Sequence, residues 1–168
     1  WNYPLSMIGR SLACAMATGN STIIKTPELT PLAATVFAQA LEKADIPPGV
    51  VNIICGYGNE AGAYLVSHPD VNHVVFTGSV ATGKKILHAA ADKAIPAIVE
   101  LGGKSANIIL DDADFQSAIE GGARHCFLNS GQSCNAPTRM LVPEVRQDEA
   151  KEIAKNAAET TKVGDPFG

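Results

Sequence analysis

The 168-residue sequence contains little charge, few aromatic residues and no long apolar run. Charged residues make up 18%, against roughly 25% in a typical soluble domain, and 13 basic and 17 acidic side chains leave a net charge of −4. Because phosphate binding relies on clustered lysine and arginine, the lack of basic runs argues against a nucleic-acid-binding or membrane-surface protein. No stretch approaches the ~20 apolar residues that span a bilayer, and no secretory signal pattern opens the sequence. We therefore expect a cytoplasmic protein.

Cysteine is also scarce, and its four positions lack both a C-x-x-C pair and the density of a disulfide scaffold. We therefore expect reduced thiols. Cys14, Cys55 and Cys126 have apolar neighbours and are expected to be buried, whereas Cys134 lies in a polar loop. The four histidines lack the spacing of metal ligands, so no metal site is predicted.

What the sequence does contain is an alternation of short β-branched runs with alanine-rich helical stretches, and 46% hydrophobic residues to form a core. This alternation predicts repeated βαβ units and hence an α/β fold built on a parallel sheet. The expected strands are Thr22–Lys25, Val50–Cys55, Val71–Thr77, Ala97–Leu101, Asn107–Leu110 and Thr138–Val142. The expected helices are Leu5–Ala17, Pro31–Lys43, Glu60–Ser67, Ala81–Ala91, Phe115–Leu128 and Asp148–Thr160. Gly102-Gly103 interrupts the alternation and is the expected hinge between two domains, residues 1–102 and 103–168.

A first glycine-rich loop, Gly56-Tyr-Gly58-Asn-Glu-Ala-Gly62, lies between an expected strand and an expected helix. Its G-x-G-x-x-x-G spacing is one residue longer than the dinucleotide-binding fingerprint, and the acidic residue expected about 20 positions later is missing. On its own the loop is weak evidence for a nucleotide, and a plain strand-to-helix turn is the simpler interpretation.

A second glycine-rich loop, Gly78-Ser-Val-Ala-Thr-Gly83-Lys84-Lys85, also follows an expected strand. It nearly matches a P-loop, but Lys85 stands where a serine or threonine would hold Mg²⁺, which argues against a P-loop nucleotide hydrolase. The turn still directs free backbone N–H groups of a helix N-terminus at an anion, and a pyrophosphate is the usual ligand of such a turn.

Two further positions carry candidate chemistry. Glu100 lies at the end of an apolar strand, where burial would favour the protonated form and suit a general base; solvation or pairing with Lys104 is the simpler alternative. Cys134 lies in the polar loop Asn129–Asn135, where nearby N–H groups or cations could stabilise a nucleophilic thiolate. His125 lies inside an expected helix, so a protease-like Cys-His pair has weak support.

Five motifs together resemble the NAD(P)-dependent aldehyde dehydrogenase superfamily in their order and spacing. They are Trp1-Asn-Tyr-Pro4, Lys25-Thr-Pro-Glu28, Phe76-Thr-Gly-Ser79 with Gly83, Glu100-Leu-Gly-Gly-Lys104 and Gly131-Gln-Ser-Cys134, and the likeness extends to Val163–Phe167. Members of the family are considerably longer and commonly oligomeric. The resemblance therefore implies the middle section of a homo-oligomeric enzyme: a partial Rossmann-like NAD-binding domain over 1–102, and the first part of an α/β catalytic domain over 103–168.

The resemblance implies roles for three catalytic residues. Cys134 resembles the nucleophile whose thiolate attacks the aldehyde carbonyl to form a thiohemiacetal. The side-chain amide of Asn2 and the backbone N–H of Cys134 resemble the oxyanion hole. Hydride transfer leaves a thioester, and Glu100 resembles the base that activates water for its hydrolysis to a carboxylic acid. The implied function is oxidation of a small-molecule aldehyde with NAD(P)⁺.

The same resemblance implies a site for NAD. Lys25 and Glu28 match the pair that holds the adenosine ribose hydroxyls, and the acidic Glu28 favours NAD over NADP, whose 2′-phosphate it would repel. Ser79, together with Gly78, matches the pyrophosphate contact. The other cofactor-binding positions that the resemblance implies are Trp1, Asn2, Gly58, Gly62, Phe76, Thr77, Leu101 and Gly102.

The sequence departs from the family pattern at two positions. Many relatives carry a lysine at position 11, where it assists proton relay near the general base, whereas this chain has Ser11 beside Arg10. Either Arg10 takes over part of that role or the relay runs through water. Position 128, aromatic in many relatives, is Leu128, which predicts a wider or less aromatic substrate tunnel.

Two alternative functions stay open beside aldehyde oxidation. The chain could be an inactive, truncated nucleotide-binding module that keeps the cofactor half-site without turnover. It could also resemble the CoA-acylating aldehyde dehydrogenases, which pass the acyl group to CoA instead of water. Glu100 argues against this last alternative, because CoA-acylating relatives commonly lack it.

Overall fold

The computed structural model describes residues 1–165 and 167. Its contacts divide the chain into two compact units, Trp1–Leu101 and Gly102–Gly168, and each unit is described by itself. The division falls beside Gly102-Gly103, the expected hinge, while the assignment of the units to a cofactor domain and a catalytic domain stays a prediction. Pro166, within the Val163–Phe167 motif, lies outside the described residues.

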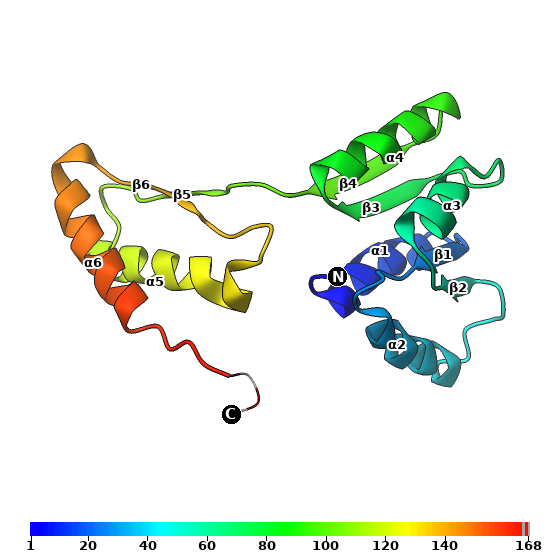
Figure 1. Ribbon diagram of the computed structural model, residues 1–168, viewed down its shortest axis with the longest axis horizontal. Coiled ribbons are helices and arrows are strands. Elements are labelled where there is room, and N and C mark those ends of the chain that lie inside the picture. The colour runs from blue at the N-terminus through cyan, green and yellow to red at the C-terminus, as the bar shows by residue number, and fades with distance from the viewer. Residues whose placement is uncertain (166, 168) are drawn as a thin grey trace. The chain divides into compact units, whose positions relative to one another are not determined.

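Three βαβ motifs form the framework of the described chain (Figure 1). They are β1 (Thr22–Lys25), α2 (Pro31–Lys43) and β2 (Val51–Ile54); β3 (Val74–Gly78), α4 (Val80–Asp92) and β4 (Ala97–Leu101); and β5 (Ala106–Ile108), α5 (Phe115–Phe127) and β6 (Arg139–Leu141). In each βαβ motif the two strands pair in parallel, which requires a crossover such as the intervening helix. The α/β class is confirmed. Among the described residues, however, the strands form three separate two-stranded sheets.

The remaining elements are α1 (Pro4–Ala17), α3 (Ala63–Ser67), α6 (Gln147–Glu159), a π turn over Gly58–Gly62, and 3-10 turns over Leu128–Gly131 and Glu144–Arg146. Two predicted elements begin three residues later than expected. The strand expected from Val71 begins only at Val74, because the Val71 N–H bonds the His68 carbonyl in a turn at 3.2 Å. The helix expected from Glu60 begins only at Ala63, after the π turn.

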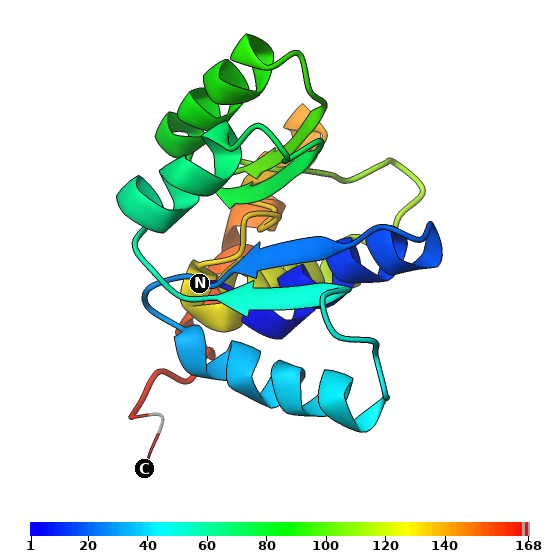
Figure 2. The same ribbon diagram turned by 90° about the vertical axis from the view of Figure 1, so that its right-hand side faces the viewer.

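In the first unit, apolar side chains of α1 and α2 pack with the β1–β2 pair. The buried members are Ile8, Leu12 and Ala34, with Ile24 and Ile53 partly buried against them. Figure 2 shows the arrows of β1 and β2 pointing the same way, with α2 below them. Burying each large aliphatic side chain contributes about 1.5–3 kcal/mol, so this small cluster holds the strand that ends at the candidate residue Lys25.

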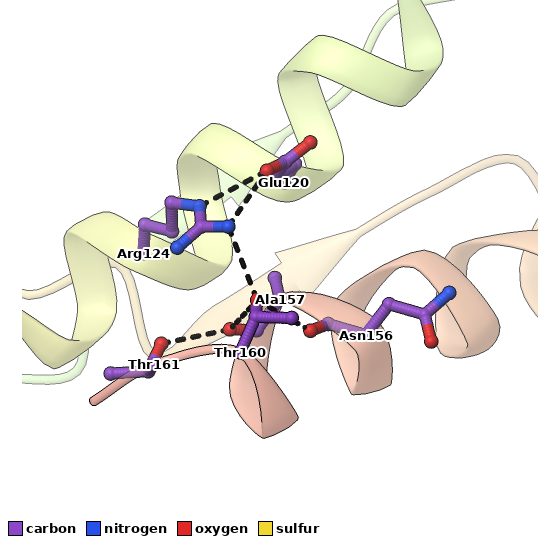
Figure 3. Close-up of polar contacts among 6 residues, drawn as sticks. All are labelled: Glu120, Arg124, Asn156, Ala157, Thr160 and Thr161. Carbon is purple, nitrogen blue, oxygen red and sulfur yellow. Dashed lines mark hydrogen bonds and ion pairs between the residues drawn. The ribbon is translucent and has the colours of Figure 1, made fainter. Parts of the chain in front are cut away.

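The second unit has a denser core between α5, α6 and the β5–β6 pair. Ile119 is completely buried, and Ile109, Phe115, Ala150 and Ile153 surround it. Polar contacts reinforce the pairing of the two helices, as Figure 3 shows. Arg124 lies 2.9 Å from the Glu120 carboxylate within α5 and donates to the Thr160 hydroxyl, just after α6, at 3.2 Å.

Candidate functional site

Lys25 and Glu28 form a polar cluster at the carboxyl end of β1. The Lys25 ammonium donates to the carbonyls of Thr26 at 2.6 Å and Gly56 at 2.9 Å, and lies 3.6 Å from the Glu28 carboxylate. The same carboxylate oxygen accepts a short hydrogen bond from the backbone N–H of Gly58. The structure thus brings together three of the residues predicted to bind the cofactor.

Glu28 is held as a carboxylate. A hydrogen bond from its own backbone N–H, a second from Gly58 and the nearby Lys25 charge lower the pKa of Glu28 below its ordinary value of 4.5. The carboxylate faces a pocket of about 180 Å³, and paired oxygens of this kind accept well from neighbouring hydroxyls such as those of a ribose. The pocket is lined by Thr26, Pro27, Glu28, Pro31, Cys55, Gly56 and Tyr57.

The conformation of the glycine loop after β2 accounts for its spacing, which is one residue longer than the dinucleotide-binding fingerprint. Residues Gly58–Gly62 form a π turn, in which the N–H of Gly62 bonds the carbonyl of Tyr57 five residues earlier at 3.3 Å. A π turn accommodates one residue more than an α turn. A Cβ on Gly62 would make an ordinary contact with the Lys25 stem at 3.4 Å, so the turn lies directly beside that side chain.

Ser79 caps the helix that follows β3. Its hydroxyl accepts from the N–H of Thr82 at 3.2 Å, and α4 then runs for 13 residues. Gly83 in the first turn lets this helix approach β4, since a Cβ there would lie 2.6 Å from Leu101. A Cβ on Gly78 would lie 2.5 Å from the Phe76 ring, which therefore packs against that glycine. The expected turn between a strand and a helix N-terminus is therefore present, and anion binding by this N-terminus stays a prediction.

Glu100 and Thr77 lie side by side on the other face of the β3–β4 pair. They are register partners in the parallel ladder, and both are exposed. Alternate residues Val99 and Leu101 are half-buried toward α4. Of the two alternatives left open for Glu100, burial and solvation, this chain shows the solvated one, because the alternation of the strand directs the Glu100 side chain away from the helix. The guanidinium of Arg10, in α1, donates to the Thr77 hydroxyl at 3.4 Å.

The first residues of the chain lead directly into α1. Trp1 is 54% exposed, and its carbonyl accepts a hydrogen bond from the Thr30 hydroxyl at 3.4 Å. Asn2 is partly buried, and Tyr3 takes a left-handed conformation (φ 50°) as the N-cap residue of α1. Asn2 thus immediately precedes the N-cap residue of α1.

Cys134 lies on an exposed loop that follows three left-handed residues. Asn129 (φ 54°), Ser130 (φ 56°) and Gly131 (φ 72°) form this run at the end of α5. Such conformations are costly for serine and persist only where surrounding structure holds them. After Cys134 the chain is fixed by Ala136, which is buried and donates its N–H to Ser133 at 3.1 Å. The thiol is accessible on a constrained backbone.

The other three cysteines correct one expectation. All four thiols are free, but Cys14 and Cys55 are exposed and Cys126 is only partly buried. The predicted burial of Cys14 and Cys55 is therefore wrong for this chain. Cys55 follows β2 and lines the pocket beside Glu28, where its sulfur accepts a hydrogen bond from Thr26 at 3.5 Å.

Several contributors to the site were not singled out from the sequence. Thr26 is buried in the pocket wall, and Gly56 has a backbone conformation (φ 151°) and a close approach to Ala61 that exclude a side chain. Gly56 belongs to the glycine-rich loop that the sequence analysis identified, whereas no local sequence pattern predicts the burial of Thr26. Gly102 is exposed at the start of the second unit. Asn2 and Glu100 belong to the first unit and Cys134 to the second, so their joint geometry stays a prediction.

Metal sites and membrane spans are two other classes of feature that the described residues could hold. Within residues 1–165 and 167, no group of three or more histidine, cysteine, aspartate or glutamate side chains could hold a metal ion. No helix in that same part of the chain has the length and apolar character to cross a membrane. An open cavity of about 460 Å³ lies over β5 and α5, with Asn107, Ile109 and Pro137 in its wall.

Comparison with known proteins gives consistent matches. The model of the aldehyde dehydrogenase family matches residues 1–168. A 3-succinoylsemialdehyde-pyridine dehydrogenase from a Pseudomonas species is 45% identical over 167 residues, covering 99% of this chain and 35% of its own length. An aldehyde dehydrogenase from Emericella nidulans is 44% identical over 168 residues, covering 99% of this chain and 34% of its own. The chain thus spans about a third of the length of these curated relatives.

Solved structures agree with these matches. A variant of aldehyde dehydrogenase C from Pseudomonas syringae, in complex with NAD⁺ and octanal, has a TM-score of 0.94 and 44% identity, covering 100% of this chain and 35% of that one. The NAD⁺ complex of an aldehyde dehydrogenase from Bacillus cereus has a TM-score of 0.92 and 40% identity, covering 98% and 33%.

Proposed function

Because this chain belongs to the aldehyde dehydrogenase family, we propose that the protein carrying it oxidises an aldehyde to a carboxylic acid with NAD⁺. The observation that carries the proposal is Cys134, an accessible thiol on a loop that follows a run of left-handed residues. Strained, exposed loops between regular elements are where nucleophiles are commonly found. The resemblance supports an aldehyde as the small-molecule partner and a homo-oligomeric full-length protein, and a cytoplasmic location is the expectation from the sequence itself.

The proposed chemistry begins with the Cys134 thiolate, whose sulfur bonds to the aldehyde carbonyl carbon. The Asn2 amide and the Cys134 backbone N–H donate to the oxygen on which negative charge develops, which lowers the barrier. Departure of a hydride from the former carbonyl carbon would convert the thiohemiacetal to a thioester, and bound NAD⁺ would supply the acceptor for that hydride. Glu100 then takes a proton from water as the water oxygen bonds to the thioester carbon, the C–S bond breaks and its electron pair returns to sulfur. The product is a carboxylic acid.

The contacts of the first unit support NAD as the cofactor. Glu28 is ionised and faces the pocket beside Lys25, an arrangement that suits ribose hydroxyls and would repel the 2′-phosphate of NADP. Ser79 and the N-terminus of α4 suit the pyrophosphate. The residues proposed to complete the cofactor cleft are Trp1, Asn2, Gly58, Gly62, Phe76, Thr77, Gly78, Leu101 and Gly102.

The test is aldehyde oxidation by the full-length protein. Mixed with NAD⁺ and a panel of aldehydes, it should produce NADH, and Cys134→Ala should reduce the rate by more than about 10³-fold, as loss of a catalytic nucleophile does. Cys126→Ala is the matched control, because it removes a partly buried thiol from the same unit, and it should keep the wild-type rate.

Three results would contradict the proposal in different ways. Absence of NADH with every aldehyde, together with retained NAD⁺ binding, would favour a nucleotide-binding module without turnover. An unchanged rate in Cys134→Ala would exclude the covalent mechanism. Formation of NADH that requires added CoA and yields an acyl-CoA would favour the acylating alternative, in which water activation by Glu100 is unnecessary.

A further inference from the structure

Arg139, the first residue of β6, holds two neighbouring carbonyls of the segment that leads into β5. Its backbone N–H donates to the Ser105 carbonyl at 3.2 Å, and its side-chain Nε donates to the Lys104 carbonyl at 2.8 Å. The first bond continues the parallel β5–β6 ladder, whose pairs start at Ala106 and Arg139. The second bond comes from the side chain and lies one residue further from the ladder.

A proline explains why a side chain makes this second bond. A parallel ladder of this register would continue with the N–H of residue 137 donating to the Gly103 carbonyl, but Pro137 has no N–H. The N–H of Thr138 is already used, because it donates to the Ala136 carbonyl at 2.8 Å in a tight turn. The backbone of β6 therefore cannot extend the ladder, and the Arg139 guanidinium supplies the next hydrogen bond.

The segment that Arg139 holds lies beside the candidate nucleophile. A Cβ on Gly103 would make an ordinary contact with the backbone carbonyl of Cys134 at 4.0 Å, so the two backbones are neighbours. From Cys134 the chain reaches β6 through short turns, in which the buried Ala136 donates its N–H to Ser133 at 3.1 Å. Arg139 therefore acts on both sides of the loop that carries Cys134: its backbone continues from that loop, and its side chain fixes the segment that the loop contacts.

We infer that Arg139 is a positioning residue for Cys134: its bond to the Lys104 carbonyl keeps the preceding glycine beside the nucleophile loop, and this fixes where the sulfur and the backbone N–H of the cysteine lie. The inference rests on the proposed function, in which both groups must meet one aldehyde carbonyl, the sulfur at its carbon and the N–H at its oxygen. The role of Arg139 is to hold the backbone, and it exchanges no proton in the reaction.

The test compares turnover with thiol reactivity in the full-length enzyme. In Arg139→Met, kcat for NADH formation should fall about 10- to 100-fold, because a displacement of about 1 Å separates the sulfur and the N–H from the carbonyl that both must meet. The KM for NAD⁺ should change little, since nearly all the residues proposed to bind the cofactor lie in the first unit. Alkylation of Cys134 by iodoacetamide, followed by mass spectrometry at several pH values, should keep its rate and pH profile, because this reaction needs a thiolate but no oxyanion contact.

Two further variants separate positioning from a general loss of stability. Arg139→Lys should recover part of the lost kcat, because an ammonium can still donate to the Lys104 carbonyl. Arg124→Met is the matched control: it removes another exposed arginine of the second unit, one that bonds Glu120 (Figure 3), and it should keep the wild-type kcat. Hydrogen exchange of the backbone amides around Cys134 should be faster in Arg139→Met than in Arg124→Met, whether or not an aldehyde is turned over.

Three results would overturn the inference. An unchanged kcat in Arg139→Met, or an equal loss in Arg124→Met, would mean that the bond to the Lys104 carbonyl does not position the nucleophile. Slower alkylation of Cys134, with a pH profile moved to higher pH, would mean that the guanidinium charge stabilises the thiolate instead. If the wild-type enzyme forms no NADH with any aldehyde, the proposed function fails by itself, and equal hydrogen exchange in the two variants would then show that Arg139 does not hold the loop.

Discussion

The two units of this chain keep their candidate residues in place by different means. In the second unit a continuous core around the fully buried Ile119 joins both helices to both strands. In the first unit the buried cluster is smaller, and it consists of Ile8, Leu12 and Ala34. The candidate cofactor residues lie outside that cluster, at strand ends and turns, where hydrogen bonds and glycine contacts fix them.

This difference follows from what each unit has to hold. The cofactor proposed for the first unit would meet backbone N–H groups and carboxylates at close range, which suits the small residues and short polar contacts found there. The second unit holds the proposed nucleophile, Cys134, on a loop with a strained backbone. Left-handed residues other than glycine cost of order 1–3 kcal/mol each, and Asn129 and Ser130 both adopt this conformation. Burial of apolar side chains in the core around Ile119 offsets the free-energy cost of these left-handed residues.

The largest predicted effect tests the packing of the second unit. Ile119→Ala should lower the free energy of unfolding by about 2–5 kcal/mol, because it removes a completely buried side chain and leaves a cavity. Urea unfolding of the full-length protein, followed by hydrogen exchange of the α5 and α6 amides, measures this loss. Ile108→Ala is the control, since Ile108 is 63% exposed and its truncation should cost about 0.5 kcal/mol or less. Equal losses in the two variants would remove the contrast between the units.

An intermediate effect tests the close approaches of the first unit. Gly83→Ala should destabilise α4 and β4 by about 1–3 kcal/mol, because its Cβ would lie 2.6 Å from Leu101 and must displace either the side chain or the helix. Hydrogen exchange of the α4 amides reports the change. Gly121→Ala is the matched substitution in a helix of the second unit, with nothing within 4 Å of the new Cβ, and should stabilise α5 by up to about 1 kcal/mol. Effects of the same sign would show that helix propensity, rather than packing against Leu101, governs both positions.

Local patterns were sufficient to predict most elements of both units. Thr22–Lys25, Ala97–Leu101 and Pro31–Lys43 occur with the predicted bounds, because β-branched runs and a proline at a helix start are local signals. The joint arrangement of Lys25, Glu28 and Gly58 was also implied, by resemblance to a family.

Local patterns could not predict the features that depend on contacts between distant segments or on unusual backbone conformations. The contact of Arg10 with Thr77 joins segments 67 residues apart. The π turn at Gly58–Gly62 and the left-handed Asn129 and Ser130 are conformations with weak sequence preferences. The sequence left both burial and exposure open for Glu100, because an apolar strand can be covered on one face or on two, and α4 packs against only one face of β4.

The smallest predicted effect compares one carboxylate from each unit. Glu28 and Asp114 both accept backbone N–H groups, from Gly58 and Ser117, and the pKa of each is lowered from its ordinary value of 4.5 or 3.8. A lowered pKa means that the charged form stabilises the fold. This contribution is complete above the ordinary value and is lost as the pH falls through the lower folded pKa. Titration of both carboxyl signals by NMR should find each below its ordinary value.

Substitution of a neighbour distinguishes the causes of these two shifts. Lys25→Met should leave most of the lowering at Glu28, because hydrogen bonds from its own backbone N–H and from Gly58 contribute more than the lysine charge. Ser117→Ala should leave the larger part of the shift at Asp114, since the backbone N–H of residue 117 remains. A return of Glu28 to its ordinary pKa in Lys25→Met would mean that the charge pair, rather than the backbone turn, fixes this carboxylate, and that the first unit depends on side chains more than its geometry implies.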